Sequence, residues 1–121
     1  MKRSCLAMML SAAALLLAGC GADRPPPGVQ GDPQRGKIAL TQYACHSCHV
    51  VPGVAGSQVY VGRPLDDLSK RRYIAGKVPN NQASLVRFIL DPQALDPGTA
   101  MPTLGVSERD ALDISAYLLS K

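Results

Sequence analysis

The sequence predicts a small all-α domain formed by residues 32–121, with three to four helices. Apolar residues recur three and four positions apart in several segments, which is the helical period. Residues that cap helices stand directly before those segments. No stretch alternates polar and apolar residues as a half-buried strand does. A chain of 121 residues has room for one domain.

The first helix is expected to begin after Asp32. Its carboxylate can accept the free N–H groups of a first turn, and Pro33 suits the first helical position because no N–H is needed there. Gly36 leaves space for a close approach by another element. The helix is expected to run into Cys45, with an apolar side made of Ile38, Leu40 and Tyr43.

Two further helical segments precede a long loop. A short turn is expected within residues 64–72, where Leu65 and Leu68 have helical spacing. Asn81 can cap the next helix, which is expected to stop at Asp91 because the proline that follows disfavours helical backbone. The apolar face of this helix consists of Leu85, Phe88 and Ile89.

The last helix has the clearest start signal. Ser107 followed by Asp110 forms a capping box. The apolar stripe behind it consists of Ala111, Ile114, Tyr117 and Leu118. Between this helix and the previous one, residues 91–105 are rich in proline and glycine and are expected to loop, with Met101 near their middle.

Residues 1–19 have the organisation of an export signal. Lys2 and Arg3 precede an apolar run that is shorter than the roughly 20 residues needed to cross a bilayer. The end of the signal, Leu17-Ala18-Gly19-Cys20, resembles a bacterial lipoprotein processing box, which implies cleavage before Cys20 and lipid on that residue. An ordinary secretory cleavage site nearby is the alternative. Both interpretations predict an exported protein.

Residues 20–31 are interpreted as a lipidated cysteine and a tether. They contain three consecutive prolines and no apolar periodicity, so we expect a semi-rigid spacer. In polyproline form, at about 3.1 Å per residue, it would hold the domain about 30 Å from the lipid headgroups. Removing the signal lowers the formal net charge of +4 by two. This small positive charge gives no reason to expect nucleic-acid binding.

The chemistry of the domain centres on residues 45–49, Cys-His-Ser-Cys-His. A thioredoxin-type redox pair needs a preceding strand and a following helix, whereas a helix is expected before Cys45. A structural zinc site needs four ligands, and the chain has no second cysteine or histidine pair. An iron–sulfur cluster needs four cysteines, and the domain has two. Covalent haem is the favoured interpretation.

In that interpretation Cys45 and Cys48 form thioethers with haem c, and His49 is the proximal ligand of the iron. His46 lies between the attached cysteines and cannot reach the opposite face of the same haem. Met101 is the one methionine left after signal removal, so it is the expected distal ligand. The alternative is an ordinary core methionine that fills a gap.

These residues resemble the class I cytochrome c family over nearly all of residues 32–121. The resemblance rests on the helix that leads into the haem motif, on the Met-Pro pair in GTAMP, and on the last helix, which ends in AYLLSK. It implies that Gly36 meets the last helix near Tyr117, with one haem supplying much of the core.

The chain departs from the family pattern at two places. Members often carry Gly-Pro-x-Leu, whose proline carbonyl accepts a hydrogen bond from the proximal histidine; here the sequence is Gly62-Arg63-Pro64-Leu65, and the Arg63 carbonyl is expected to serve. Phe88 stands where many members have a tryptophan that donates to a haem propionate. Tyr73 or Arg72 is expected to compensate.

Histidine and methionine ligation leaves the iron no open position, so the sequence predicts a one-electron carrier with a positive potential and not an enzyme. Expected partners are redox proteins: an oxidase, a cytochrome complex or a dehydrogenase. The carrier would be anchored to a membrane on its periplasmic side. The basic run at residues 70–72 is either solvated surface or a contact for propionates or an acidic partner. The alternative function is a haem-free copper-handling or thiol-redox protein that uses the same cysteines, His49 and Met101.

Overall fold

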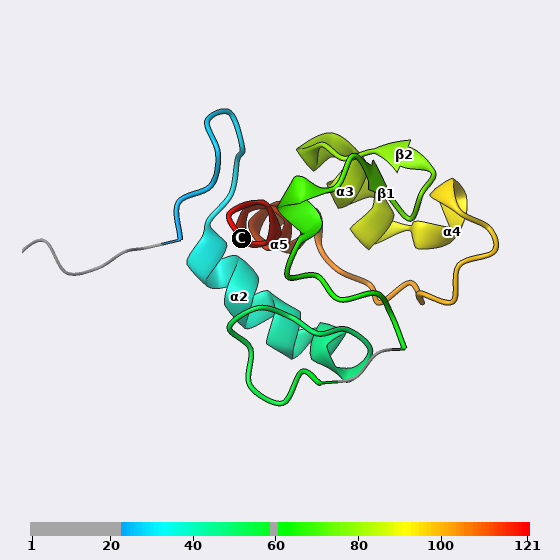
Figure 1. Cartoon of the computed structure of the whole chain (residues 1–121), viewed down its shortest axis with the longest axis horizontal. Helices are drawn as coiled ribbons and strands as arrows, with labels where there is room; N and C mark the ends of the chain where they lie inside the picture. The colour runs from blue at the N-terminus through cyan, green and yellow to red at the C-terminus, as the bar shows by residue number, and fades with distance from the viewer. Residues whose placement is uncertain (1–22, 59–60) are drawn as a thin grey trace, which may run out of the picture.

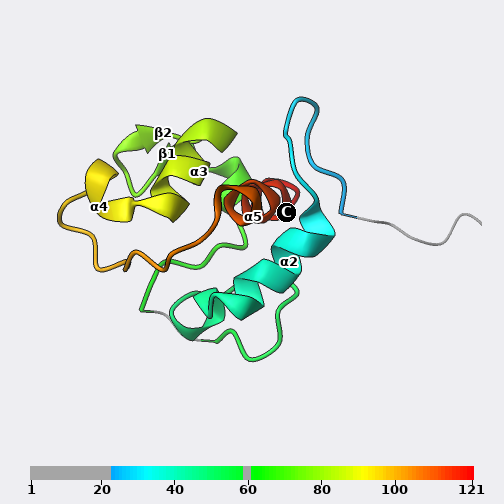
Figure 2. The ribbon, with the colours of Figure 1, turned by 180° about the vertical axis from the view of Figure 1, so that it is seen from behind.

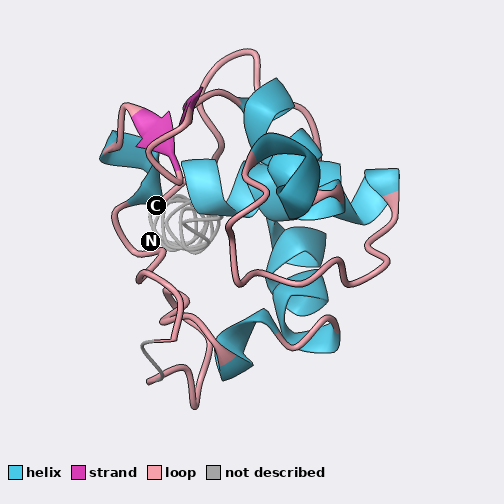
Figure 3. Cartoon of the chain, turned by 90° about the vertical axis from the view of Figure 1, so that its right-hand side faces the viewer, coloured by secondary structure: helices cyan, strands magenta, loops and turns pink. Residues whose placement is uncertain are grey.

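The computed structural model describes residues 23–58 and 61–121, so the predicted signal peptide and Cys20 lie outside the described residues. The described helices are α2 (Pro33–Gln42), α3 (Gln82–Leu90), α4 (Pro92–Leu95) and α5 (Glu108–Leu119), with 3-10 turns η1 (Cys45–Ser47) and η2 (Leu68–Lys70) (Figures 1 and 3). The strands β1 (Tyr73–Ile74) and β2 (Val78–Pro79) form a two-stranded antiparallel pair. The predicted all-α class is confirmed.

Helix α2 begins as predicted but ends earlier. The Asp32 carboxylate accepts hydrogen bonds from the backbone N–H groups of Gln34 and Arg35, and Pro33 takes the first position. The helix does not run into Cys45: it stops at Gln42, and Ala44 adopts left-handed backbone with φ of 54° before η1 begins. A residue in that conformation cannot continue a right-handed helix.

The predicted apolar side of α2 is partly wrong. Leu40 is buried, but Ile38 is 58% exposed. The reason is geometric, because residues two apart on a helix project about 160° apart and cannot share a face. The face that α2 presents to α5 consists of Gly36, Ala39 and Leu40, and the two helices cross there (Figure 2).

Gly36 provides the predicted close approach, at a different point of α5. A Cβ at this position would lie 2.0 Å from the Asp113 carbonyl oxygen and 2.9 Å from the Ile114 nitrogen. The contact is therefore about one turn before Tyr117, where the resemblance had put it. Tyr117 instead donates a hydrogen bond from its hydroxyl to the carbonyl of Pro52 at 2.5 Å.

Helix α3 follows the prediction, whereas its surroundings hold two unpredicted elements. Asn81 accepts from the Ser84 N–H at 2.9 Å, and the predicted apolar residues of α3 are buried. After α3, Asp91 caps α4 by accepting from the Ala94 N–H, with Pro92 at its first position. The β1–β2 pair was not predicted because strands of two residues are too short to show a period. Turn η2 lies within the predicted segment 64–72.

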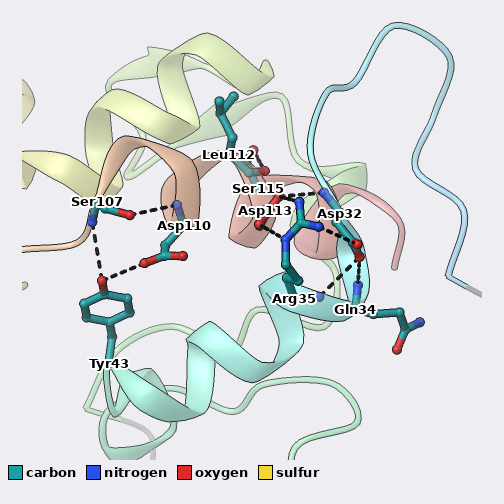
Figure 4. A network of polar contacts seen from close by, with 9 residues as sticks. All are labelled: Asp32, Gln34, Arg35, Tyr43, Ser107, Asp110, Leu112, Asp113 and Ser115. Atoms are coloured by element: carbon teal, nitrogen blue, oxygen red, sulfur yellow. Dashed lines mark hydrogen bonds and ion pairs between the residues drawn. The ribbon is translucent and has the colours of Figure 1, made fainter.

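The start of α5 uses half of the predicted capping box. The Ser107 hydroxyl accepts from the Asp110 N–H at 3.1 Å. The Asp110 carboxylate does not bond back to Ser107. It accepts from the Tyr43 hydroxyl at 2.8 Å, and the Ser107 N–H donates to that same hydroxyl oxygen at 3.4 Å (Figure 4). Tyr43 thus connects the end of α2 to the start of α5. The predicted stripe of α5 is buried throughout.

The described part of the predicted tether, residues 23–31, contacts the domain. Gln30 and Gln82 exchange two hydrogen bonds: the Gln30 N–H donates to the Gln82 side-chain oxygen at 2.8 Å, and the Gln82 amide donates to the Gln30 carbonyl at 2.5 Å. Asp23 forms an ion pair with Lys121. An extended spacer would not have these contacts. Within the described ranges, every helix is too short or too polar to span a bilayer.

Candidate functional site

The four predicted haem-site residues of the domain line one cavity. Its volume is about 380 Å³, and Cys45, Cys48, His49 and Met101 all form part of its wall. The cysteines and His49 come from the chain that follows α2, and Met101 comes from the loop between α4 and α5. The apolar wall includes Leu40, Leu68, Leu85, Phe88, Ile114 and Leu118. Cys20 lies outside the described residues.

The turn after α2 brings the three motif residues to the cavity together. Cys45, Cys48 and His49 are spaced i, i+3 and i+4, which places side chains on one side of a helical turn. The turn is closed by hydrogen bonds from the N–H groups of Cys48 and His49 to the Cys45 carbonyl, at 3.2 and 3.0 Å. His46 stands outside this spacing and does not line the cavity.

The ring of His49 is oriented by the backbone of residues 62–63. Its Nδ1 lies 2.7 Å from the Arg63 carbonyl oxygen, the contact expected from the sequence. A carbonyl oxygen only accepts, so Nδ1 carries the proton and Nε2 keeps its lone pair for a ligand role. Gly62 packs against the ring, where an added Cβ would lie 2.2 Å from His49 Cε1. Only glycine fits there without moving the histidine.

Met101 is held through its backbone. The Gln93 side-chain amide donates to the Met101 carbonyl at 2.6 Å, and the Gln93 oxygen accepts from the Thr103 hydroxyl at 2.9 Å. The Met101 N–H donates to the Thr99 hydroxyl at 3.3 Å. Helix α4 therefore supports the methionine loop. Gln93 was not predicted as a site residue, although the Asp91-Pro92 pair before it repeats the cap-and-proline signal of Asp32-Pro33.

Cys45 has the environment of an unreactive thiol. Both Cys45 and Cys48 are free. Burial raises the pKa of the Cys45 thiol above its ordinary value; a backbone hydrogen bond lowers it by less, and the neighbouring Cys48 raises it slightly. A redox-active cysteine needs the opposite, a lowered pKa that populates the thiolate. The thiol-redox alternative requires a strand before the motif and a helix after it. Here helix α2 precedes the motif and a loop follows it.

The described residues form no zinc-type ligand set. Among residues 23–58 and 61–121, no three His, Cys, Asp or Glu side chains gather as a ligand set for a metal ion. A structural zinc site built on protein ligands needs such a set.

Arginine and tyrosine supply polar groups at the cavity. Arg63, Arg71 and Tyr73 line it, whereas Arg72, one of the two residues expected to compensate for Phe88, does not. Arg71 is fixed by hydrogen bonds to the Pro64 carbonyl and the Asp67 carboxylate. The Arg71 hydrogen bond is the main cause of the lowered pKa of Asp67. The buried Nε of Arg71 has no partner among the described residues.

Comparison with known proteins identifies the fold. No family model matches the chain. Over 87 residues it is 33% identical to cytochrome c oxidase subunit 2 of Alkalihalophilus pseudofirmus, an alignment that covers 71% of this chain and 25% of that protein. The chain thus spans about a quarter of that relative.

A solved structure, cytochrome c2 of Rhodobacter sphaeroides, superimposes with a TM-score of 0.56 and 22% identity, covering 74% of this chain and 94% of the other. The chain therefore has the small all-α fold of cytochrome c2.

Proposed function

We propose that this chain is a monohaem c-type cytochrome that carries single electrons. One observation carries the proposal: in a cytochrome c2-like fold, two cysteines, a histidine and a methionine line the same cavity. Cys45 and Cys48 would attach the haem, and His49 and Met101 would bind its iron. When bound, the haem supplies a one-electron iron couple whose potential thioether ligation raises.

The cavity residues suit a haem. A volume of about 380 Å³ lies in the range of small-molecule and cofactor pockets, roughly 300–1,000 Å³. The wall is mainly apolar and suits the ring, while Arg71 Nε and the Tyr73 hydroxyl can donate to its carboxylates. The Arg63 carbonyl holds His49 in the tautomer that iron requires.

Haem staining of a denaturing gel tests the attachment. Only covalent haem stays with the polypeptide after denaturation, so the wild-type band should stain when the host attaches haem. The double variant Cys45→Ala/Cys48→Ala should not stain, and Ser47→Ala, from the same turn, should stain like the wild type. A folded wild-type protein without colour would refute the proposal.

We also propose that the carrier is anchored at Cys20 to the periplasmic side of a membrane. The lipoprotein-like sequence Leu17-Ala18-Gly19-Cys20 supports this. Because the named relative is an oxidase subunit, an oxidase is the first partner to test, ahead of a cytochrome complex or a dehydrogenase. Cys20→Ser should release the protein from sedimented membranes. If the variant still sediments, the lipid assignment is wrong.

A further inference from the structure

The segment before α2 is fastened to the domain at both of its ends. Near its start, Asp23 pairs with Lys121, the last residue of the chain. At its end, Gln30 exchanges hydrogen bonds with Gln82, whose amide also donates to the Ser115 hydroxyl at 2.9 Å. Residues 23–31 therefore form a loop that is fastened at its two ends, to the residue after α5 and to the start of α3, while residues 26–28 between them are exposed (Figure 1). We call this segment the strap.

Gly31 lets the end of the strap lie directly against α5. Its φ is +103°, a value that other residues rarely adopt, and a Cβ there would be 2.6 Å from the Leu112 carbonyl oxygen. The next residue continues the contact, because the Asp32 N–H donates to the Asp113 carboxylate at 2.6 Å. The geometry of this junction thus depends on a backbone that only glycine adopts readily.

The strap and the cavity lie on different sides of α5. Ile114 and Leu118 line the cavity, whereas the strap contacts α5 at Leu112, through Gly31. Leu112 and Ile114 project about 160° apart around the helix. In Figures 1 and 2 the strap leaves one end of the molecule, and the turn after α2 and the loop between α4 and α5 lie toward the other.

We propose that the strap determines which face of the domain meets the membrane. The face formed by the strap, the end of α5 and the start of α3 lies toward the bilayer, and the cavity opens away from it, toward the redox partner. This inference rests on the proposed lipid at Cys20. Two residues lie between Cys20 and Asp23, so the span of three residue steps is about 10 Å at most. The domain is therefore held closer to the bilayer, and in a more defined orientation, than a free spacer of about 30 Å would allow.

Hydrogen exchange tests the docking of the strap. The measured site is the Gln30 N–H in the mature haem-loaded protein, because it donates to Gln82. The double variant Gln82→Ala/Lys121→Ala is called the strap variant. Its Gln30 N–H should exchange roughly fivefold faster than that of the wild type, which is the effect of losing about one hydrogen bond. The control Gln34→Ala/Lys77→Ala changes the same residue types at exposed positions outside the strap and should exchange at the wild-type rate. Equal rates in the wild type and the strap variant would overturn the proposal.

Energy transfer to the haem tests the orientation. The lipidated proteins are bound to vesicles whose lipid headgroups carry a fluorophore, and haem quenches that fluorescence more strongly at shorter distance. The strap variant should quench roughly twofold more than the wild type, because a released tether lets the haem side reach the bilayer. The control should match the wild type. Equal quenching by the wild type and the strap variant would show that the strap does not orient the domain.

A third variant, Asp23→Ala, guards against a folding defect from the double substitution. It leaves α3 and α5 unchanged and should increase quenching in the same direction; no increase would contradict the proposal. Failure of the proposed function is distinguishable. An unstained band refutes haem attachment, and a stained protein that stays in the supernatant refutes anchoring. The exchange rates of that stained protein still report whether the strap is docked.

Discussion

At the scale of single residues, the orientation of His49 is set by neighbours that the motif itself does not include. Arg63 contributes only its carbonyl, and this hydrogen bond forms at 2.7 Å without a proline at position 63. Gly62 has no side chain and therefore leaves room for the His49 ring. The histidine ring is thus positioned by backbone on one side and by close packing on another.

Gly62→Ala should displace the His49 ring, because the new Cβ would lie 2.2 Å from Cε1. We expect weakened iron ligation, measured as a changed absorption spectrum and a lower midpoint potential in haem-loaded protein. Gly98→Ala is the matched control, since a Cβ there meets only Asp96 at an ordinary 3.7 Å. A Gly62→Ala protein with the wild-type spectrum would show that the ring does not depend on this glycine.

Met101→Ala tests the distal ligand. Axial ligands move haem potentials over a range of roughly 0.8 V, and loss of a thioether should lower the potential by about 0.1–0.3 V. The opened iron should also bind carbon monoxide readily in the ferrous state. Leu104→Ala changes another cavity residue of the same loop and should leave ligation intact. If Met101→Ala keeps both potential and spectrum, Met101 is a packing residue.

The cavity residues were predictable from the sequence, whereas the residues that hold them in place were not, for a physical reason. Cys45, Cys48 and His49 have a spacing that places their side chains on one side of a helical turn. Met101 was the one methionine left as a soft ligand once the predicted signal is removed. Gln93 acts on the backbone carbonyl of a residue eight positions away, and a backbone acceptor leaves no trace in side-chain pattern. Arg71 lines the cavity and Arg72 does not. Which of two adjacent side chains points toward the cavity depends on the local backbone conformation, which the sequence pattern does not reveal.

At the scale of elements, the crossing of α2 and α5 combines close packing with a buried carboxylate. Asp113 is 2% exposed and accepts hydrogen bonds from Arg35 Nε and Nη2, at 2.7 and 3.1 Å, and from the Asp32 N–H (Figure 4). Burial alone would raise the pKa of Asp113. The bonds from Arg35 and Asp32 outweigh that effect, and the pKa lies below its ordinary value.

Asp113→Asn should lower the free energy of unfolding at pH 7 by about 2–3 kcal/mol, because bonds to a charged acceptor are lost. The lowered pKa means that the wild type has this stabilisation above the ordinary aspartate pKa near 4 and loses it as the pH falls through the folded-state value. The difference between wild type and variant should therefore shrink below about pH 4. Denaturant titrations between pH 3 and 7 measure it, with the exposed Asp66→Asn as control. A pH-independent difference would contradict this account.

The elements that the sequence predicted are those with a strong local start signal. Asp32, Asn81 and Ser107 each cap their helix as expected. The β1–β2 pair and the end of α2 depend on contacts and backbone conformations with no periodic signal. The capping box at Ser107 was half right because Tyr43, 67 positions before Asp110, captures the carboxylate that would have closed it.

At the scale of the whole molecule, the core is incomplete without something in the cavity. Several large apolar side chains of the domain, including Phe88 and Ile114, form the wall of this cavity. A domain of this size has little core to spare. The fold of cytochrome c2 was predictable because the Cys-x-x-Cys-His motif, the helix before it, the Met-Pro pair and the last helix together resemble the class I cytochrome c family.

The haem-free chain should therefore lack a stable native state. An empty cavity costs about 24 cal/mol per Å³, so 380 Å³ corresponds to about 9 kcal/mol, an upper bound because water enters an open cavity. That is comparable to the whole stability of a small domain, about 5–15 kcal/mol. Cys45→Ser/Cys48→Ser, made in a haem-attaching host and stripped of any loosely held haem, should lose cooperative thermal unfolding while the wild type retains it. Circular dichroism and calorimetry measure both. A stripped variant that unfolds cooperatively within a few degrees of the wild type would show that the helices alone sustain the fold.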